Sequence, residues 1–192
     1  QDHMEVIGKE VGLNVKVIIT DGSQPVGRGI GPALEAIDIL KVLKNEADAP
    51  KDLTERSLLL AGELLELSGK VDSGTGYQTA KQVLESGKAY KKFISICKAQ
   101  GRFSQPVLAH YKNEVRAEKP GVLQVIDNRK IAKLAKLSGA PQSKSAGIHL
   151  NVRLGENIEK GQLLYTIYAE SKGELNYALE YKNHHDNIIT LI

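Results

Sequence analysis

The chain has 192 residues, of which 41% are apolar, and a formal net charge of +3 from 26 basic and 23 acidic residues. This length suits one large or two small domains, and the even spread of both charge signs argues against a nucleic-acid surface. The single cysteine, Cys97, excludes an internal disulfide framework and a multi-thiolate zinc site. The sequence has neither an apolar run of the ~18 residues that a membrane span needs nor a signal peptide. We therefore expect a cytoplasmic protein with no nucleic-acid or membrane partner.

Residues 1–11 have the periodicity of a helix, with Met4, Ile7 and Val11 on one face. Gln1 is not an initiator residue. Two explanations stay open: a fragment cut from a longer chain, which we favour, or a vector remnant that ends at His3-Met4.

The first part of the chain predicts one strand followed by four helices. Residues 14–20 (NVKVIIT) are β-branched and almost continuously apolar, as in a parallel strand that is covered on both faces. Pro32 suits the first position of a helix. The predicted helices cover residues 32–43, 52–67, 77–86 and 89–99. This order is typical of an α/β domain.

After Gly101 the pattern changes to short alternating segments. Strands are predicted at 111–118, 121–127, 147–154 and 163–169, with helices at 128–137 and 174–181. Gly, Ser and Pro cluster between residues 101 and 110, which indicates a boundary. We expect a partial α/β domain over residues 1–104, with a parallel strand and helices, and an α+β domain with a small curled sheet over residues 105–192.

The segment TDGSQPVGRGIGP at residues 20–32 places four glycines between the predicted strand and the next helix. Successive backbone N–H groups could hold a phosphate, but GRGIG matches a dinucleotide fingerprint weakly, because six residues separate it from the strand. Loop carbonyls together with the Asp38 carboxylate could instead bind a cation. A purely structural role, a tight return of the chain, is the third possibility.

Other candidate motifs favour structural roles. The segment GENIEKGQLLY at residues 155–165 has the spacing of a hairpin in biotinyl or lipoyl carrier domains, but no lysine stands at the tip of another hairpin. His184, His185 and Asp186 lie in a polar stretch near the end, which favours a solvated tail over a metal site. We expect His149 to be structural and Cys97 to be a buried, inert thiol.

Three ordered motifs resemble the C-terminal part of the pyrimidine nucleoside phosphorylase family, which includes thymidine phosphorylase and AMP phosphorylase. They are TDGSQPVGRGIGPALEA, ESGKAYKKF and KSAGIHLNVRLGENIEKGQLLYTIYAES, and together they span nearly the whole chain. The resemblance implies a glycosyltransferase that cleaves a nucleoside with phosphate to free base and sugar 1-phosphate. It also implies a homodimer of the full-length enzyme and a barrel-sandwich hybrid fold for the C-terminal domain.

The family's phosphate-binding and base-binding segments lie upstream of the motifs matched here. The resemblance therefore implies no catalytic residue in this chain, which we expect to be inactive alone. The resemblance implies no required cofactor. It does imply a structural potassium ion, whose carbonyl and carboxylate ligands in the family match Val26, Gly29 and Asp38. Asp38 stands where the family has a longer glutamate, and with the other ligands absent we expect an empty site. The substrate stays open between thymidine and AMP, and the rival function is a non-catalytic binding module with a phosphorylase-like fold.

Overall fold

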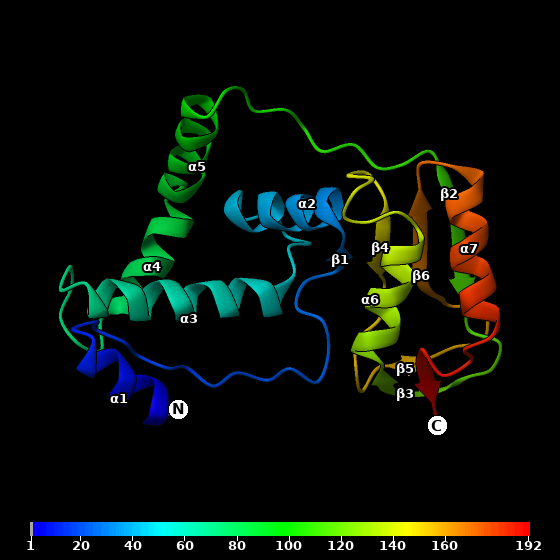
Figure 1. The fold of residues 1–192 in the computed structure, drawn as a ribbon, viewed down its shortest axis with the longest axis horizontal. Coiled ribbons are helices and arrows are strands. Elements are labelled where there is room, and N and C mark those ends of the chain that lie inside the picture. The colour runs from blue at the N-terminus through cyan, green and yellow to red at the C-terminus, as the bar shows by residue number, and fades with distance from the viewer. Residues whose placement is uncertain (1) are drawn as a thin grey trace.

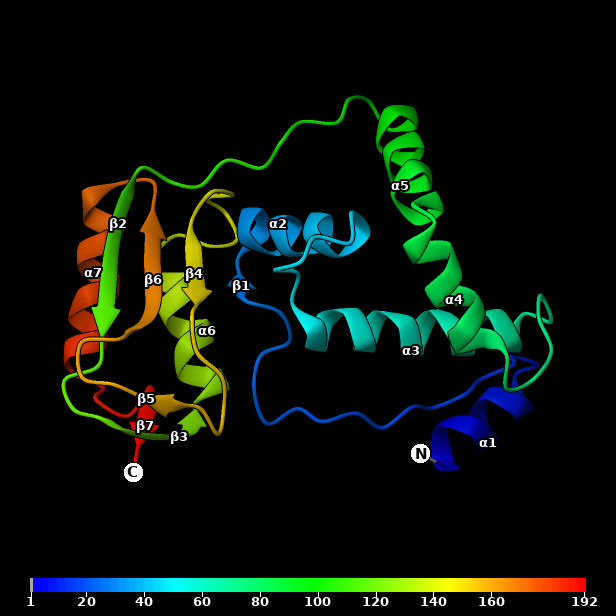
Figure 2. The same ribbon diagram turned by 180° about the vertical axis from the view of Figure 1, so that it is seen from behind.

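The computed structural model describes residues 2–192 and combines seven helices with two antiparallel sheets. Figure 1 shows helices α2 to α5 on one side and both sheets with α6 and α7 on the other. Two extended stretches run between these groups, residues 13–28 along one margin and residues 100–110 along the opposite one. Figure 2 shows the same arrangement from behind. Among the described residues, no helix is long and apolar enough to cross a membrane.

The helices form where the sequence predicts them. Their bounds are α1 Asp2–Glu10, α2 Pro32–Leu43, α3 Lys51–Leu67, α4 Gly76–Glu85, α5 Lys88–Ala99, α6 Asn128–Leu137 and α7 Lys172–Asn183. Pro32 begins α2, as predicted. Side-chain caps start the last two helices: Asp127 accepts from the N–H groups of Arg129 and Lys130, and Ser171 forms a capping box with Glu174. Gln1, included in the first predicted helix, lies outside the described residues.

A four-stranded sheet has the order β1-β4-β6-β2, and a three-stranded sheet has the order β5-β3-β7. The strands are β1 Gly29–Ile30, β2 Tyr111–Arg116, β3 Gly121–Ile126, β4 Gly147–Leu150, β5 Asn157–Ile158, β6 Leu163–Ala169 and β7 Ile189–Leu191. All pairings in the described part are antiparallel. The mixture of helix and sheet agrees with the expected class.

The expectation of a parallel strand at residues 14–20 is wrong for this chain. That segment is extended but joins no sheet in the described structure. A strand needs a neighbour for its backbone N–H and C=O groups, and no other strand of residues 2–192 lies beside this one. Sequence reasoning also missed β1 and β7, which are only two and three residues long.

The main core lies between the sheets and helices α6 and α7, and includes Leu123, Ile131, Leu134, Ile148 and Ile167. A second, smaller cluster joins α2, α3 and α4 through Val42, Leu58, Ala80 and Leu84. β1 pairs with β4, Gly29 opposite His149, so the glycine loop is part of the larger sheet. The proposed division at residue 104 stays a prediction. It falls in the extended stretch before β2, whereas the β1–β4 pairing crosses between the two regions.

Candidate functional site

The glycine loop between residues 20 and 32 folds over the first two turns of α2. The Asp38 side chain is buried, with 4% of the residue exposed, and Oδ2 accepts hydrogen bonds from the N–H groups of Arg28 (2.6 Å) and Gly29 (2.8 Å). A carboxylate that accepts two backbone N–H groups holds them in place strongly, because the acceptor is charged. The loop is thus fixed to α2 from inside.

Two glycines of the loop are required by close approach. A Cβ on Gly29 would lie 2.5 Å from the backbone carbon of Leu34, and one on Gly27 would lie 2.9 Å from Asp38 Oδ2. Gly27 also has a φ of 82°, in the left-handed region that favours glycine. Glycine is needed at these two positions because the loop backbone approaches α2 more closely than any side chain permits.

Arg153, which follows β4, holds the loop from the other side. Its guanidinium donates to the carbonyl oxygens of Pro25 (3.2 Å) and Gly27, and it forms an ion pair of 3.2 Å with Asp52 Oδ2. Asp52 in turn accepts from the N–H of Gly27 at 3.2 Å. Burial and the nearby Arg28 lower the pKa of Arg153, while Asp52 and Asp38 oppose this. The planar five-donor geometry of arginine suits such a set of acceptors.

The structure brings two of the three predicted cation ligands, Gly29 and Asp38, together. The group of Gly29 that meets Asp38 is a hydrogen-bond donor, whereas a cation ligand must be an acceptor. Asp38 meets the N–H of Gly29, not its carbonyl group. The donor ends of two amides therefore point at Oδ2 of Asp38, and the neighbouring Gly27 and Pro25 carbonyls bind Arg153. Val26, the third predicted residue, is half-buried between them. The Pro25 and Gly27 carbonyls of the loop are thus acceptors for the Arg153 guanidinium, and the cation site at Val26, Gly29 and Asp38 stays a prediction.

His149 lies opposite Gly29 in the β1–β4 pair. Burial lowers the pKa of His149, while a hydrogen bond with Asn151 and the charge of Asp38 oppose the shift and Lys41 and Arg28 add to it. Arg28 also has a buried Nη1 without a hydrogen-bond partner. His149 is therefore part of the same charged junction, a placement that its sequence position in an alternating strand did not indicate.

The other sequence candidates lie apart from this junction. His184 and His185 each bond a backbone carbonyl one turn earlier, and the His185 ring stacks on Tyr181 at 4.0 Å between ring centroids. His185 and Asp186 also line a hollow of about 650 Å³ beside β2, β6 and β7. Cys97 is half-buried on α5, less buried than expected. Within residues 2–192, no three His, Cys, Asp or Glu side chains gather into a metal-binding group.

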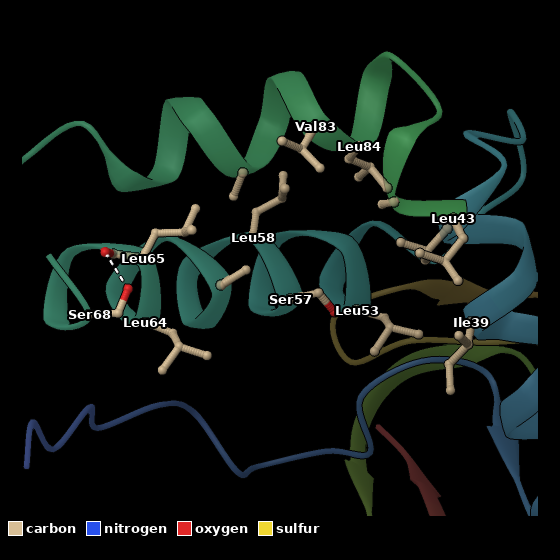
Figure 3. Close-up of a pocket in the computed structure, with 14 residues that line it drawn as sticks. Ile39, Leu43, Leu53, Ser57, Leu58, Leu64, Leu65, Ser68, Val83 and Leu84 are labelled. Atoms are coloured by element: carbon tan, nitrogen blue, oxygen red, sulfur yellow. Dashed lines mark hydrogen bonds between the residues drawn. The ribbon is translucent and has the colours of Figure 1, made fainter. Parts of the chain in front are cut away.

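A groove of about 690 Å³ lies among α2, α3, α4 and the start of α5. Figure 3 shows apolar side chains from these helices around it. The lining is Ile39, Val42, Leu43, Leu53, Ser57, Leu58, Ala61, Leu64, Leu65, Ser68, Ala80, Val83, Leu84 and Ala89. The groove carries no charged residue, so its chemistry is that of a protein interior and not of a phosphate or sugar site.

Comparison of the sequence with known proteins shows which family it resembles. Residues 122–187 match the model of the pyrimidine nucleoside phosphorylase C-terminal domain. The chain is 55% identical over 188 residues to a protein of Legionella pneumophila (strain Corby), and 51% identical over 189 residues to one of Hahella chejuensis (strain KCTC 2396). Both relatives are named "Putative thymidine phosphorylase".

These alignments cover 98% of this chain but only 36% and 37% of the two relatives. The chain therefore spans little more than a third of the length of the curated relatives it matches. The match to the C-terminal domain and the high identity agree with the resemblance that the sequence motifs carry. The chain belongs to the pyrimidine nucleoside phosphorylase family, as a C-terminal part.

Proposed function

We propose that this chain is part of a thymidine phosphorylase, a glycosyltransferase that acts on pyrimidine nucleosides. The observation that carries this proposal is the 55% identity, over 98% of the chain, to a relative of that name. In the reaction the glycosidic C–N bond breaks and a phosphate oxygen bonds to the sugar carbon. The base leaves with a proton, and the products are free base and sugar 1-phosphate. Such a reaction depends on positioning and on stabilisation of developing charge.

The role we assign to this chain is structural support for the enzyme, without activity of its own. Arg153 forms an ion pair with Asp52, and the Asp38 carboxylate accepts from two backbone N–H groups of the loop. An interaction that accelerates the reaction must be stronger in the transition state than in the ground state, and groups that already have partners offer little of that kind. The catalytic groups of the full-length protein would then come from the part beyond this chain.

The decisive experiment measures release of free base from thymidine, uridine, cytidine and AMP in the presence of phosphate. It compares the 192-residue chain with the product of the full reading frame that encodes it. We expect activity on thymidine in the full-length product only. Preference for AMP would replace the substrate in this proposal. Activity in neither form would favour the non-catalytic binding module.

One observation weighs against the binding module. Such a module would present a polar surface where further domains dock, whereas Met4, Ile7, Val11, Leu13 and Ile19 are all exposed apolar residues. Exposed apolar side chains can be buried when another part of the protein packs on them. Their exposure supports a chain that is packed against more of the same protein.

Finer features of the enzyme follow as proposals. We propose a barrel-sandwich hybrid for residues 105–192, supported by the two antiparallel sheets around one apolar core.

For the full-length protein we propose a cytoplasmic homodimer, which light scattering after size exclusion would test. We also propose that a potassium ion at Val26, Gly29 and Asp38 requires ligands from the remainder of the enzyme. Equal melting temperatures of the full-length protein in KCl and choline chloride would contradict a potassium site.

A further inference from the structure

The hollow beside β2, β6 and β7 has the size of a small-molecule site. Its volume of about 650 Å³ lies within the range of about 300–1,000 Å³ that is typical of ligand pockets. In Figure 1 the chain leaves the end of α7 and turns into β7 close to the C-terminus, and both of these segments contribute to the wall. None of the residues that line the hollow belongs to the junction of the glycine loop. The wall combines apolar side chains with charged ones, unlike the groove among the helices.

Tyr165 brings a hydroxyl group without a partner to this hollow. The residue is only 2% exposed and its ring belongs to the main core. It stands opposite Val115 in the β2–β6 pair, and both residues line the hollow from the same face of the sheet. Within residues 2–192 no hydrogen bond reaches the Tyr165 hydroxyl, and burial raises the pKa of Tyr165, so the group keeps its proton. A buried hydroxyl is costly unless it finds a hydrogen-bond partner, and a ligand in the hollow would supply one.

Two lysines of the wall lack an acidic partner in the described structure. Lys182, near the end of α7, is half-buried, and its one hydrogen bond is a long one of 3.4 Å to Asn183 Oδ1. Lys119 lies exposed in the connection between β2 and β3. A half-buried ammonium group interacts with an anion more strongly than a fully hydrated one does, because less water screens the pair.

The other charged residues of the wall are less suited to a ligand. Arg116 already donates to the Gly161 carbonyl at 3.0 Å and to Glu114 Oε2 at 2.5 Å. Glu118 and Asp186 are exposed, so water and salt screen their negative charges. The charge that remains open and partly desolvated at the hollow is therefore positive.

We propose that this hollow binds a small organic anion, which has an apolar or planar body and carries one carboxylate or phosphate group. The body packs on apolar residues such as Val115 and Leu164, and a polar atom at its buried end bonds to the Tyr165 hydroxyl. Lys182 and Lys119 hold the anionic group at the more exposed end. A bare inorganic anion would leave both the apolar wall and the hydroxyl unused. The inference does not rest on the proposed function.

The test is isothermal titration calorimetry of the 192-residue chain with thymidine 5′-monophosphate, 4-hydroxyphenylacetate, thymidine and inorganic phosphate. The first two probes carry an anionic group on a ring, whereas thymidine lacks the anion and inorganic phosphate lacks the body. We expect at least one of the first two to bind at a single site, about tenfold or more tighter than thymidine and phosphate do. Binding of the nucleotide would identify a phosphate ester as the ligand, and binding of 4-hydroxyphenylacetate a carboxylate. A Kd above about 1 mM for both would overturn the proposal.

Matched variants assign the binding to the hollow. Lys182→Gln should weaken it about tenfold, because a charge-assisted hydrogen bond is lost. Lys172→Gln, at the exposed start of the same helix and outside the hollow, should leave it unchanged. Tyr165→Phe should weaken binding about threefold to tenfold, and Tyr168→Phe, on the same strand but outside the hollow, should not. Equal affinities in a variant and its control would place the ligand elsewhere and overturn the proposal.

Two further measurements do not depend on the choice of probe or on the isolated chain. The melting temperature of Tyr165→Phe should equal or exceed that of the parent, because the hydroxyl has no partner to lose. A fall of several degrees would show that the hydroxyl serves the fold, and would overturn the proposal. In the full-length product, Lys182→Gln should weaken binding of the same probe, and no effect there would mean that the rest of the enzyme covers the hollow. Binding that persists in a product without phosphorolysis would uphold this site while the proposed function fails.

Discussion

At the scale of single residues, Asp38 carries the attachment of the glycine loop to α2. It is the one buried carboxylate of the described core, and both of its recorded bonds go to loop N–H groups. Replacement by alanine leaves the N–H groups of Arg28 and Gly29 without their acceptor. Each buried unsatisfied donor costs about 1–3 kcal/mol.

We therefore predict that Asp38→Ala lowers the free energy of unfolding by about 2–4 kcal/mol. Asp38→Asn should lose less, because the amide oxygen still accepts. Urea denaturation measures both, with Asp72→Ala on an exposed turn as the control, where we expect a change within about 0.5 kcal/mol. A loss in Asp38→Ala no larger than that of the control would show that the loop does not depend on this carboxylate.

His149 gives a second prediction, on pH. Burial lowers the pKa of His149 in the folded state below its ordinary value of 6.5. The unfolded chain then binds more protons than the folded chain between these two pKa values, so stability falls as pH decreases through that interval. It is fully retained above about pH 7.5, where both states are neutral.

The measurement is the melting temperature between about pH 5 and pH 8, for the parent chain and for His149→Gln. Glutamine keeps a hydrogen-bonding side chain but has no charge to acquire. We expect the decline in melting temperature on the acid side to be shallower in His149→Gln. Parallel pH profiles would mean that other groups cause the decline.

At the scale of secondary-structure elements, α3 and α4 cross at glycine. A Cβ on Gly62 would lie 2.5 Å from the backbone nitrogen of Tyr77 at the start of α4, so the two helices meet backbone to backbone. Alanine is the better helix former by about 1 kcal/mol, so propensity and packing make opposite predictions here.

We predict that packing decides, and that Gly62→Ala lowers stability by about 1–3 kcal/mol because the helices must separate. Gly173→Ala in the first turn of α7 is the matched control, since its Cβ would find only Ser171 Oγ, at 3.9 Å. The control should be neutral or stabilising by up to about 1 kcal/mol. Chemical denaturation of the two variants distinguishes these cases, and stabilisation by both would refute the close crossing.

The local sequence pattern was sufficient to predict the helices but not the shortest strands. Helices α2 to α7 follow from apolar periodicity, to which side-chain caps add in α6 and α7, and both signals act within a few residues of one another. Strand formation depends on a partner that the local sequence does not contain. Residues 14–20 have strand composition but no neighbour in the described structure, whereas Gly29–Ile30 have little strand composition and pair with β4.

The candidate site shows the same division between local and distant information. Asp38 accepts hydrogen bonds from N–H groups that lie nine and ten residues before it in the sequence. Its proximity to the loop was therefore predictable from the glycine pattern and the helix that follows. Arg153 lies 126 residues from Gly27 in sequence. Nothing in the local pattern of either segment connects the two, so their contact required the structure.

At the scale of the whole molecule, Arg153 joins the helical part to the sheets. Its guanidinium contacts the loop at Pro25 and Gly27 and the start of α3 at Asp52, while its backbone follows β4. The side chain is only 15% exposed in this ion pair. Removal of a mostly buried cation leaves its acceptors without their donor, which is more costly than loss of an exposed pair.

We predict that Arg153→Ala destabilises the chain by about 2–4 kcal/mol and accelerates amide exchange at residues 25–30 and 147–150 together, because β1 and β4 lose the same support. Arg153→Lys should recover only part of this, since one ammonium group cannot reproduce the planar set of donors. Arg129→Ala, at an exposed position on α6, is the control. Exchange that increases in the loop alone would show that Arg153 holds the loop but does not couple it to the sheet, and the helical part would then depend on the β1–β4 pairing for its attachment.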